Sequence, residues 1–255
     1  MSIKPSVYWL IQYRSEVPEH DNWLTSGEQA LLAGKRFPKR RAEWRLGRWT
    51  AKCALAAYFE NEARNNSPGS PKVPAPLRPS LASIRMRGEE GTTTKEIEIR
   101  AAADGAPEAF MNDEPIPVAL SISHRDEIGF CVVSPGGFAV GCDVEAIEPR
   151  SDAFVTDFFT VEEQALLRQT PVEERPWIAT LIWSAKESAL KALRQGLRLD
   201  TRSVMVDLRV RPADSQSQDW NPLTVHYLET ARSFHGCWRR CGGYLQTMIA
   251  DPSPE

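Results

Sequence analysis

The chain has 255 residues, of which 42% are hydrophobic and 25% charged, and its formal net charge is −3. This composition is typical of a globular protein of one large or two ordinary domains, and the slightly acidic balance argues against a general nucleic-acid binder. No apolar run approaches the length that crosses a bilayer, and the N-terminal apolar run lacks the small-residue cleavage site of a signal peptide, so we expect no membrane partner.

The beginning of the chain predicts a strand followed by a helix. Residues 6–13 (SVYWLIQY) are rich in β-branched and aromatic side chains, which is typical of a strand. The helix after them has two possible capping boxes, one from Ser26 with Gln29 and one from Thr25 with Glu28.

A longer helix and an irregular connector come next. Residues 39–60 place apolar side chains on one side of a helix and arginines elsewhere. The segment 65–80 is dense in Pro, Ser and Gly, which predicts an irregular connector. The segments 81–87 and 95–101 flank a turn sequence and predict a β-hairpin.

The second half of the chain begins with strand patterns and continues with helices. Residues 118–148 predict two or three strands, with Ser-Pro-Gly-Gly at 134–137 as a hairpin turn. A helix over 158–169 starts with the capping box Thr160–Glu163. The longest helical pattern, 175–196, ends at Gly196 as its expected C-cap and carries an apolar stripe. That stripe consists of Ile182, Ala185, Ala189 and Leu193. Three further strands are expected at 203–210, 223–229 and 242–250.

Two carboxylates stand out in an otherwise apolar strand, AVGCDVEA at 139–146. Asp143 and Glu145 lie two positions apart, so a strand directs both to one face, while Cys142 and Val144 point to the other. Their Cα atoms are then roughly 7 Å apart, a separation that one divalent cation can bridge. A surface strand with two solvated acids is the simpler interpretation of this motif alone.

The longest helix carries a second pair of charged residues. Glu187 and Lys191 are four positions apart and share a helix face, with Trp183 one turn earlier on the same side and Lys186 adjacent. Such pairs are common on helix surfaces and contribute only about 0.2–0.5 kcal/mol. Together with the acidic strand they give three carboxylates and two lysines, a set suited to a hard cation and phosphate groups.

Basic residues and a histidine elsewhere in the chain could also serve a phosphate site. Residues 34–48 hold seven basic side chains, which a solvated helix face would explain equally well. They are Lys35, Arg36, Lys39, Arg40, Arg41, Arg45 and Arg48. Ser123 and His124 lie at the end of an expected strand, where the histidine could donate to a phosphate oxygen.

Three of these motifs resemble, in their order and spacing, those of the 4'-phosphopantetheinyl transferases. They are SISH at 121–124, VGCDVE at 140–145 and WSAKESALK at 183–191. The family patterns G-x-D-x-E and W-x-x-K-E-x-x-x-K are met by Gly141, Asp143, Glu145, Trp183, Lys186, Glu187 and Lys191. The basic helix and the GAP turn at 105–107 also resemble the family, and the likeness covers about residues 7–210. The closer match is the larger, single-chain, surfactin-synthetase-activating type.

The resemblance implies an α+β fold in which two similar α/β halves pack as a pseudo-dimer with the active site between them. We expect an N-terminal half at 1–117, with the basic helix and connector, and a C-terminal half at 118–255, with the acidic motifs. Because one chain would supply both halves, a monomer is expected. Five scattered cysteines without a secretion signal predict reduced thiols and a cytoplasmic location.

The resemblance also implies the reaction: phosphopantetheine moves from coenzyme A to a serine of an apo acyl or peptidyl carrier protein. The pathways served would be fatty-acid, polyketide or nonribosomal peptide synthesis, and the cation Mg²⁺ or Mn²⁺. Asp143, Glu145 and Glu187 would hold the cation, with Asp143, Glu187 and Lys191 as catalytic residues. Coenzyme A would be bound by seven residues, namely Lys35, Arg41, Arg45, Ser123, His124, Lys186 and Lys191.

Glu187 has a second possible role, as general base for the carrier serine. A carboxylate bound to a cation has a lowered pKa and is a poor base, so the two roles compete, and we place metal binding first. The chain also departs from the family pattern: Ala146 stands where the family often has lysine, and the connector and hairpin at 65–100 look longer than usual.

Two other functions compete with the transferase. A metal-dependent nuclease would use similar residue types, but its E-x-K motif usually lies on a strand, whereas Glu187 and Lys191 have helical spacing. A non-enzymatic binding module built on residues 34–48 would leave the acidic residues without a role.

Overall fold

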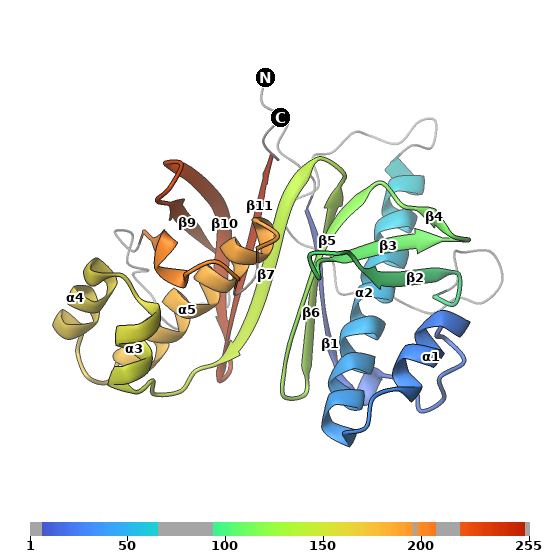
Figure 1. The fold of residues 1–255 in the computed structure, drawn as a ribbon, viewed down its shortest axis with the longest axis horizontal. Helices are drawn as coiled ribbons and strands as arrows, with labels where there is room; N and C mark the ends of the chain where they lie inside the picture. Colours follow the sequence, from blue (N-terminus) through green and yellow to red (C-terminus); the bar gives the residue numbers. More distant parts are fainter. Residues whose placement is uncertain (1–6, 66–93, 196–197, 208–219, 253–255) are drawn as a thin grey trace. The chain divides into compact units, whose positions relative to one another are not determined.

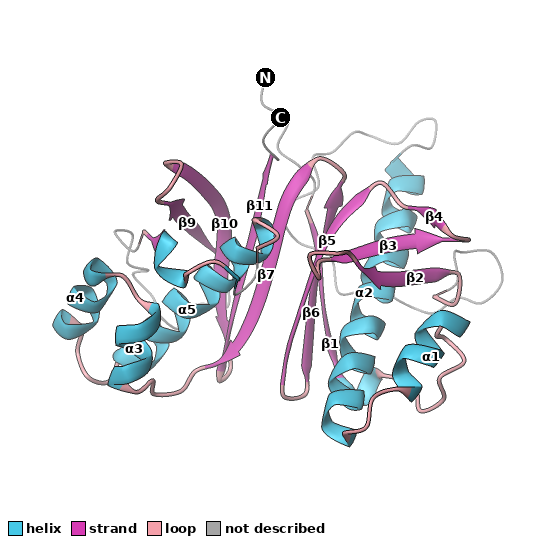
Figure 2. Ribbon diagram, in the orientation of Figure 1, coloured by secondary structure: helices cyan, strands magenta, loops and turns pink. Residues whose placement is uncertain are grey.

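The computed structural model describes residues 7–65, 94–195, 198–207 and 220–252 and divides the chain into two compact units. The first unit is Met1–Phe138 and the second is Ala139–Glu255. In Figure 1 the first unit runs from blue to green and the second from yellow-green to red. Each unit has a hydrophobic core of its own. The mixture of helices and strands confirms the α+β class (Figure 2).

The first unit contains one short and one long helix together with six strands among its described residues. In chain order these elements are β1 (Tyr8–Tyr13), the 3-10 turn η1 (Arg14–Glu16), α1 (Ser26–Ala33), α2 (Pro38–Asn65), β2 (Ile97–Ala101), β3 (Pro107–Met111), β4 (Glu114–Pro115), β5 (Val118–Arg125) and β6 (Ile128–Pro135). They form two antiparallel sheets, with strand orders β1-β6-β5 and β2-β3-β4. The long helix α2 packs against β1, β5 and β6.

Several predictions for the first unit are confirmed. The strand β1 and the helix α2 lie where the sequence patterns placed them. Of the two possible capping boxes, the structure uses Thr25 and Glu28, whose side chains each accept a backbone N–H of the other residue. The predicted connector and the first arm of the predicted hairpin, 81–87, fall outside the described residues. Its second arm is β2, which pairs with β3.

The second unit places its helices before most of its strands. Its elements are β7 (Phe138–Ala146), α3 (Asp152–Phe158), α4 (Val161–Gln169), α5 (Arg175–Ala192), the 3-10 turn η3 (Thr201–Ser203), β8 (Val204–Val206), β9 (Asn221–Tyr227), β10 (Arg232–Cys241) and β11 (Tyr244–Pro252). One sheet contains all five strands in the order β7-β11-β10-β9-β8. The helix α5 packs along this sheet against β11, β10, β9 and β8. In the part of the chain that the structure describes, no helix has the length and apolar character of a membrane span.

Two predictions about the middle of the chain differ from the structure. The sequence Ser-Pro-Gly-Gly at 134–137 does not close a hairpin, because β6 pairs with β1 and β5 whereas β7 pairs with β11. It connects the two units, with Gly137 at φ +89°. The compact units divide after Phe138, whereas the predicted halves divide after residue 117, and β5 and β6 complete the sheet that β1 begins.

The two units repeat one internal plan. In each, a first strand precedes the helices, and that strand pairs with the unit's last strand, which pairs in turn with the one before it. The helices α1 and α4 start with related sequences, TSGEQALL at 25–32 and TVEEQALL at 160–167. The long helices contain WTAK at 49–52 and WSAK at 183–186. This agrees with the prediction of two similar halves; their packing as a pseudo-dimer stays a prediction.

A buried ion pair accompanies this repeat in the first unit. The side chains of Lys52 and Glu28 are fully buried, and Lys52 Nζ lies 2.5 Å from Glu28 Oε2. Lys52 also donates to the carbonyl of Trp23, at 3.0 Å. Glu28, besides capping α1, accepts the backbone N–H of Ile99 in β2 at 3.1 Å. One carboxylate therefore connects α1, α2 and β2.

Candidate active site

The acidic strand β7 directs its two carboxylates toward α5, as the alternation predicts. Asp143 is 4% exposed and contacts Lys191, and Glu145 contacts Trp183, both on α5. Cys142 is fully buried among the residues that alternate with them. Trp183 and Lys191 are eight positions apart, with Glu187 midway between them, so the three residues form one stripe along α5. The strand and the helix thus bring the two predicted motifs together.

A glycine in β7 allows this close approach. A β-carbon added at Gly141 would lie 1.8 Å from the carbonyl oxygen of Ser188 and 2.9 Å from the backbone nitrogen of Ala192. Both atoms belong to the backbone of α5, which cannot move aside without leaving the strand. The glycine of the G-x-D-x-E motif is therefore required by packing, and this packing sets the position of Asp143 against Lys191.

Replacing Gly141 by alanine is expected to destabilise the protein by about 1–3 kcal/mol or more, because the added methyl group overpacks the interface between β7 and α5. Thermal unfolding followed by circular dichroism measures the effect. Gly243→Ala is the matched control, since a β-carbon there would meet no atom of the described residues within 4 Å. Equal melting temperatures for the two variants would contradict the packing role of Gly141.

Lys191 holds Asp143 directly. Its Nζ donates to Asp143 Oδ1 at 2.8 Å and to the carbonyl of Cys142 at 2.9 Å. Burial is the largest single effect and disfavours the charged form of Lys191, but the interactions with Asp143, Cys142 and Glu187 together outweigh it and raise the pKa of the lysine. Lys191 is therefore a fixed positive charge next to the acidic strand.

Glu145 has two partners, one of which the sequence reading missed. Its Oε1 accepts from Trp183 Nε1 at 3.1 Å, and its Oε2 lies 3.3 Å from a terminal nitrogen of Arg150. Arg150 is 12% exposed, stacks its guanidinium over the ring of Phe154 and also pairs with Glu148 at 3.2 Å. It supplies a cation close to the motif, where Ala146 provides none. In the sequence, the position of a basic residue five places after Glu145 could have identified Arg150 as a candidate partner.

Glu187 is partly buried between these pairs on the same helix stripe. Its Oε1 is buried and has no hydrogen-bond partner among the described residues. Burial raises the pKa of Glu187 to about 7, and repulsion from Asp143 and Glu145 adds to this rise against the attraction of Lys191. A carboxyl group that titrates near neutral pH is suited to accept a proton in a reaction.

This raised pKa predicts a pH dependence of stability in the presence of a chelator. Between pH 4.5 and about 7 the unfolded chain has released the Glu187 proton while the folded protein retains it, so stability falls as pH rises through this range. The loss contributed by Glu187 should approach about 3 kcal/mol and be complete above the folded pKa. Urea titrations at about pH 5 and about pH 7.5 measure it. A slope that Glu187→Gln leaves unchanged would contradict the assignment.

The donor chemistry of the three acids suits a divalent cation. All their candidate donors are carboxylate oxygens, which Mg²⁺ prefers. The orphaned oxygen of Glu187 and its repulsion by Asp143 and Glu145 identify a place where positive charge would be stabilised. Within residues 7–65, 94–195, 198–207 and 220–252, however, no three His, Cys, Asp or Glu side chains already form a ligand cluster. The metal assignment therefore stays a prediction.

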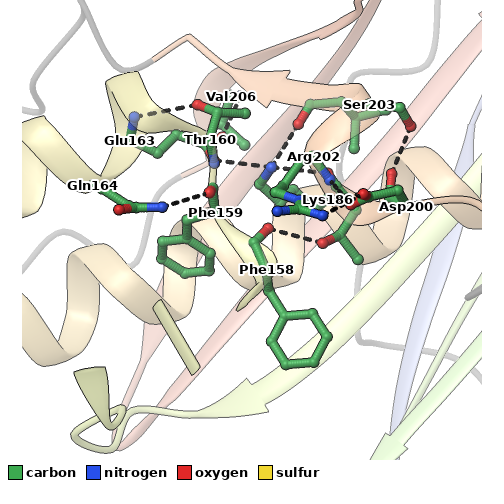
Figure 3. Close-up of polar contacts among 12 residues, drawn as sticks. Phe158, Phe159, Thr160, Glu163, Gln164, Lys186, Asp200, Arg202, Ser203 and Val206 are labelled. Carbon is green, nitrogen blue, oxygen red and sulfur yellow. Dashed lines mark hydrogen bonds and ion pairs between the residues drawn. The ribbon is translucent and has the colours of Figure 1, made fainter. Parts of the chain in front are cut away.

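Lys186 contacts residues other than these acids, and its role in binding coenzyme A stays a prediction. It is fully buried, and its Nζ pairs with Glu163 Oε2 at 2.9 Å (Figure 3). The same nitrogen donates to the carbonyls of Thr201 at 2.9 Å and Val204 at 2.5 Å. Burial lowers the pKa of Lys186, and Glu163 offsets part of this effect. All of its hydrogen-bonding capacity is used inside the fold.

Glu163, the partner of Lys186, makes the same kinds of contact as Glu28 in the first unit. Glu163 forms the predicted capping box with Thr160 and accepts the backbone N–H of Val206 in β8 at 2.9 Å (Figure 3). The first unit keeps this buried pair although Cys53 and Ala57 stand where the second unit has Glu187 and Lys191. The buried Lys–Glu pair is therefore common to both units, whereas Glu187 and Lys191 have no equivalent in the first unit.

Apart from Lys186 and Lys191, the residues predicted to bind coenzyme A lie in the first unit, and the side chains of two of them bind other residues of that unit. Arg41 donates to the carbonyl of Leu32 at 2.8 Å, and Arg45 pairs with Asp21 at 2.8 Å. Lys35 lies over the ring of Trp44, 5.7 Å from its centroid. The two residues of β5 differ: Ser123 is buried and His124 exposed, next to Gly47 of α2.

Comparison with known proteins addresses the second unit. Residues 139–245 match the family model of the 4'-phosphopantetheinyl transferase superfamily. A curated relative, the 4'-phosphopantetheinyl transferase HetI of Nostoc sp. (strain PCC 7120), is 33% identical over 80 residues. That alignment covers 31% of this chain and 33% of the relative, so the chain spans about a third of the length of the curated relative it matches.

Proposed function

Because residues 139–245 match the family model of the 4'-phosphopantetheinyl transferase superfamily, we propose that the protein transfers phosphopantetheine from coenzyme A to carrier proteins. The acceptor is a serine of an apo acyl or peptidyl carrier domain of fatty-acid, polyketide or nonribosomal peptide synthesis. The observation that supports this most strongly is the contact of Lys191 with Asp143, which joins the two sequence motifs in one cluster. Glu187 and Lys191 lie on a helix, which also favours a transferase over a strand-based nuclease site.

In the proposed reaction the serine hydroxyl oxygen attacks the β-phosphorus of coenzyme A. A new P–O bond forms to the serine, the bond to the bridging pyrophosphate oxygen breaks, and adenosine 3',5'-bisphosphate leaves. Glu187, whose pKa is about 7, can accept the serine proton near neutral pH. Lys191 stabilises the negative charge that grows on the phosphate oxygens. Both groups are held on one helix, so the fold itself sets their spacing.

Asp143, Glu145 and Glu187 would hold a divalent cation, for which we propose Mg²⁺ or Mn²⁺. When bound, the ion neutralises charge on the pyrophosphate and so favours attack by the serine. In the absence of the ion, Glu187 could act as the general base. In its presence, we propose that Glu187 acts first as a metal ligand. We propose coenzyme A as the donor in either case.

The first unit would supply the remaining contacts with coenzyme A. We propose Lys35, Arg41, Arg45 and His124 for its phosphates, with Ser123 next to His124 in β5. In this structure Arg41 donates to the carbonyl of Leu32 and Arg45 pairs with Asp21, so both would have to exchange these contacts for the phosphates. We further propose that the two units of one chain act together, as a monomer.

Incubation with coenzyme A, Mg²⁺ and apo carrier domains from the three kinds of synthase tests this function. Intact-mass measurement should show a carrier heavier by one phosphopantetheine group, and Asp143→Asn should abolish the increase. Asp200→Asn, which removes an exposed ion pair with Arg202 in the same unit, is the control and should retain transfer. Unmodified carriers throughout, or full transfer by Asp143→Asn, would contradict the proposal.

A further inference from the structure

Two basic side chains occupy the acid cluster in this structure. Lys191 binds Asp143 at 2.8 Å and Arg150 lies 3.3 Å from Glu145. Their side chains are 26% and 12% exposed, so little water screens either contact. Each of the two acids on β7 therefore has a basic counterion of its own before any metal is considered.

The charges of this cluster do not balance. Asp143, Glu145, Glu148 and Glu187 provide four carboxylates, whereas Lys191 and Arg150 provide two cations, because Arg150 pairs with Glu148 as well as Glu145. The buried Oε1 of Glu187 has no hydrogen-bond partner among the described residues, so part of the negative charge of the cluster has no donor next to it. A divalent cation at Asp143 or Glu145 would approach carboxylates that Lys191 and Arg150 already contact, and the like charges would repel one another. The two kinds of cation should therefore compete for the same carboxylates.

Arg150 keeps hydrogen-bonding capacity that its present contacts do not use. Its Nε is buried and has no hydrogen-bond partner in the described parts of the chain. A guanidinium has five N–H donors in a planar fork that matches phosphate oxygens as well as carboxylates. A phosphate ligand would satisfy the donor that the carboxylates leave unused.

We propose that Lys191 and Arg150 are exchangeable counterions of the acid cluster, which give up Asp143 and Glu145 to a divalent cation and then bind the diphosphate of the substrate. This inference rests on the proposed function and adds Arg150 to the substrate-binding residues. It makes metal and diphosphate binding cooperative, because each metal ion bound releases basic groups that a diphosphate can use. In this scheme Arg150 binds the substrate. Lys191 binds Asp143 in the metal-free state and the diphosphate in the metal-bound state.

Binding of Mn²⁺ to the metal-free protein, followed by electron paramagnetic resonance, tests the competition. Arg150→Gln should bind Mn²⁺ about tenfold more tightly than the wild type, because it removes one positive charge beside the acids. Arg150→Lys keeps the charge and should resemble the wild type. Arg202→Gln, which removes an exposed arginine of the same unit, should also leave Mn²⁺ affinity unchanged. Unchanged or weaker Mn²⁺ binding by folded Arg150→Gln would overturn the proposal.

Inorganic pyrophosphate provides a second measurement that does not depend on the folding of any variant. In the wild type, calorimetry should show that Mn²⁺ at saturation increases the affinity for pyrophosphate. Absence of any coupling between Mn²⁺ and pyrophosphate in the wild type, or absence of Mn²⁺ binding, would equally overturn the exchange.

The transfer assay separates failure of this inference from failure of the proposed function. A wild type that modifies carriers while Arg150→Gln shows unchanged Mn²⁺ affinity keeps the function and refutes the exchange. A protein that shows the expected Mn²⁺ and pyrophosphate behaviour but never modifies a carrier keeps the exchange and refutes the function.

Discussion

Replacing Lys186 by methionine is expected to lower the free energy of unfolding by about 3–5 kcal/mol. The substitution leaves the buried carboxylate of Glu163 without its cation and the carbonyls of Thr201 and Val204 without their donor. Since Glu163 also caps α4 and binds the backbone of Val206 in β8, the loss of its partner on α5 is expected to weaken the contacts among α4, α5 and β8. Urea denaturation followed by circular dichroism measures the loss.

The matched control for this prediction lies in the first unit. Lys52→Met breaks the equivalent pair with Glu28 and should be destabilising to a similar extent. The double variant Lys186→Met/Glu163→Gln should regain part of the loss, because it removes the uncompensated charge. A Lys186→Met protein as stable as the wild type but unable to bind coenzyme A would show that Lys186 is a substrate ligand after all.

Replacing Glu187 by glutamine is expected to lower kcat for carrier modification by about 10²–10⁴-fold. Glutamine keeps the size of the side chain but can neither accept a proton nor contribute a negative charge to a cation. Because we place metal binding first, Mn²⁺ affinity should fall together with kcat. Single-turnover transfer and Mn²⁺ titration of one preparation measure both.

The outcome distinguishes the two roles of Glu187. Unchanged Mn²⁺ affinity with a collapsed kcat would favour the general base and reverse our ordering. Glu173→Gln, an exposed glutamate just before α5, is the control and should change neither quantity. Wild-type turnover by Glu187→Gln would exclude both roles.

The sequence predicted the site best where the regular spacing of a strand or a helix determines which side chains share a face. Alternation on β7 correctly placed Asp143 and Glu145 on one face, and spacing by four placed Glu187 and Lys191 on one stripe of α5. The motif also suggested that Lys186 belongs to the site, although it stands four residues after Ile182 and three before Ala189, both in the apolar stripe. Its helix position therefore indicated burial, and the choice of a buried partner, Glu163, depends on tertiary packing.

Other features depended on contacts that spacing does not encode. The turn at 134–137 has hairpin composition, but the choice of partners for β6 and β7 is made by β1 and β11. The strand β10 was missed because RSFHGCWRRC does not alternate clearly. The repeat of T-x-x-E-Q-A-L-L at 25–32 and 160–167 was present in the sequence and became meaningful only when both copies proved to cap helices over a buried lysine.

Diffraction from crystals grown with coenzyme A and Mn²⁺ tests the central claim most directly. We predict an anomalous scattering peak among the carboxylates of Asp143, Glu145 and Glu187, beside the pyrophosphate. Coenzyme A bound elsewhere, with no metal peak near these acids and with Lys191 and Arg150 still on Asp143 and Glu145, would contradict the account.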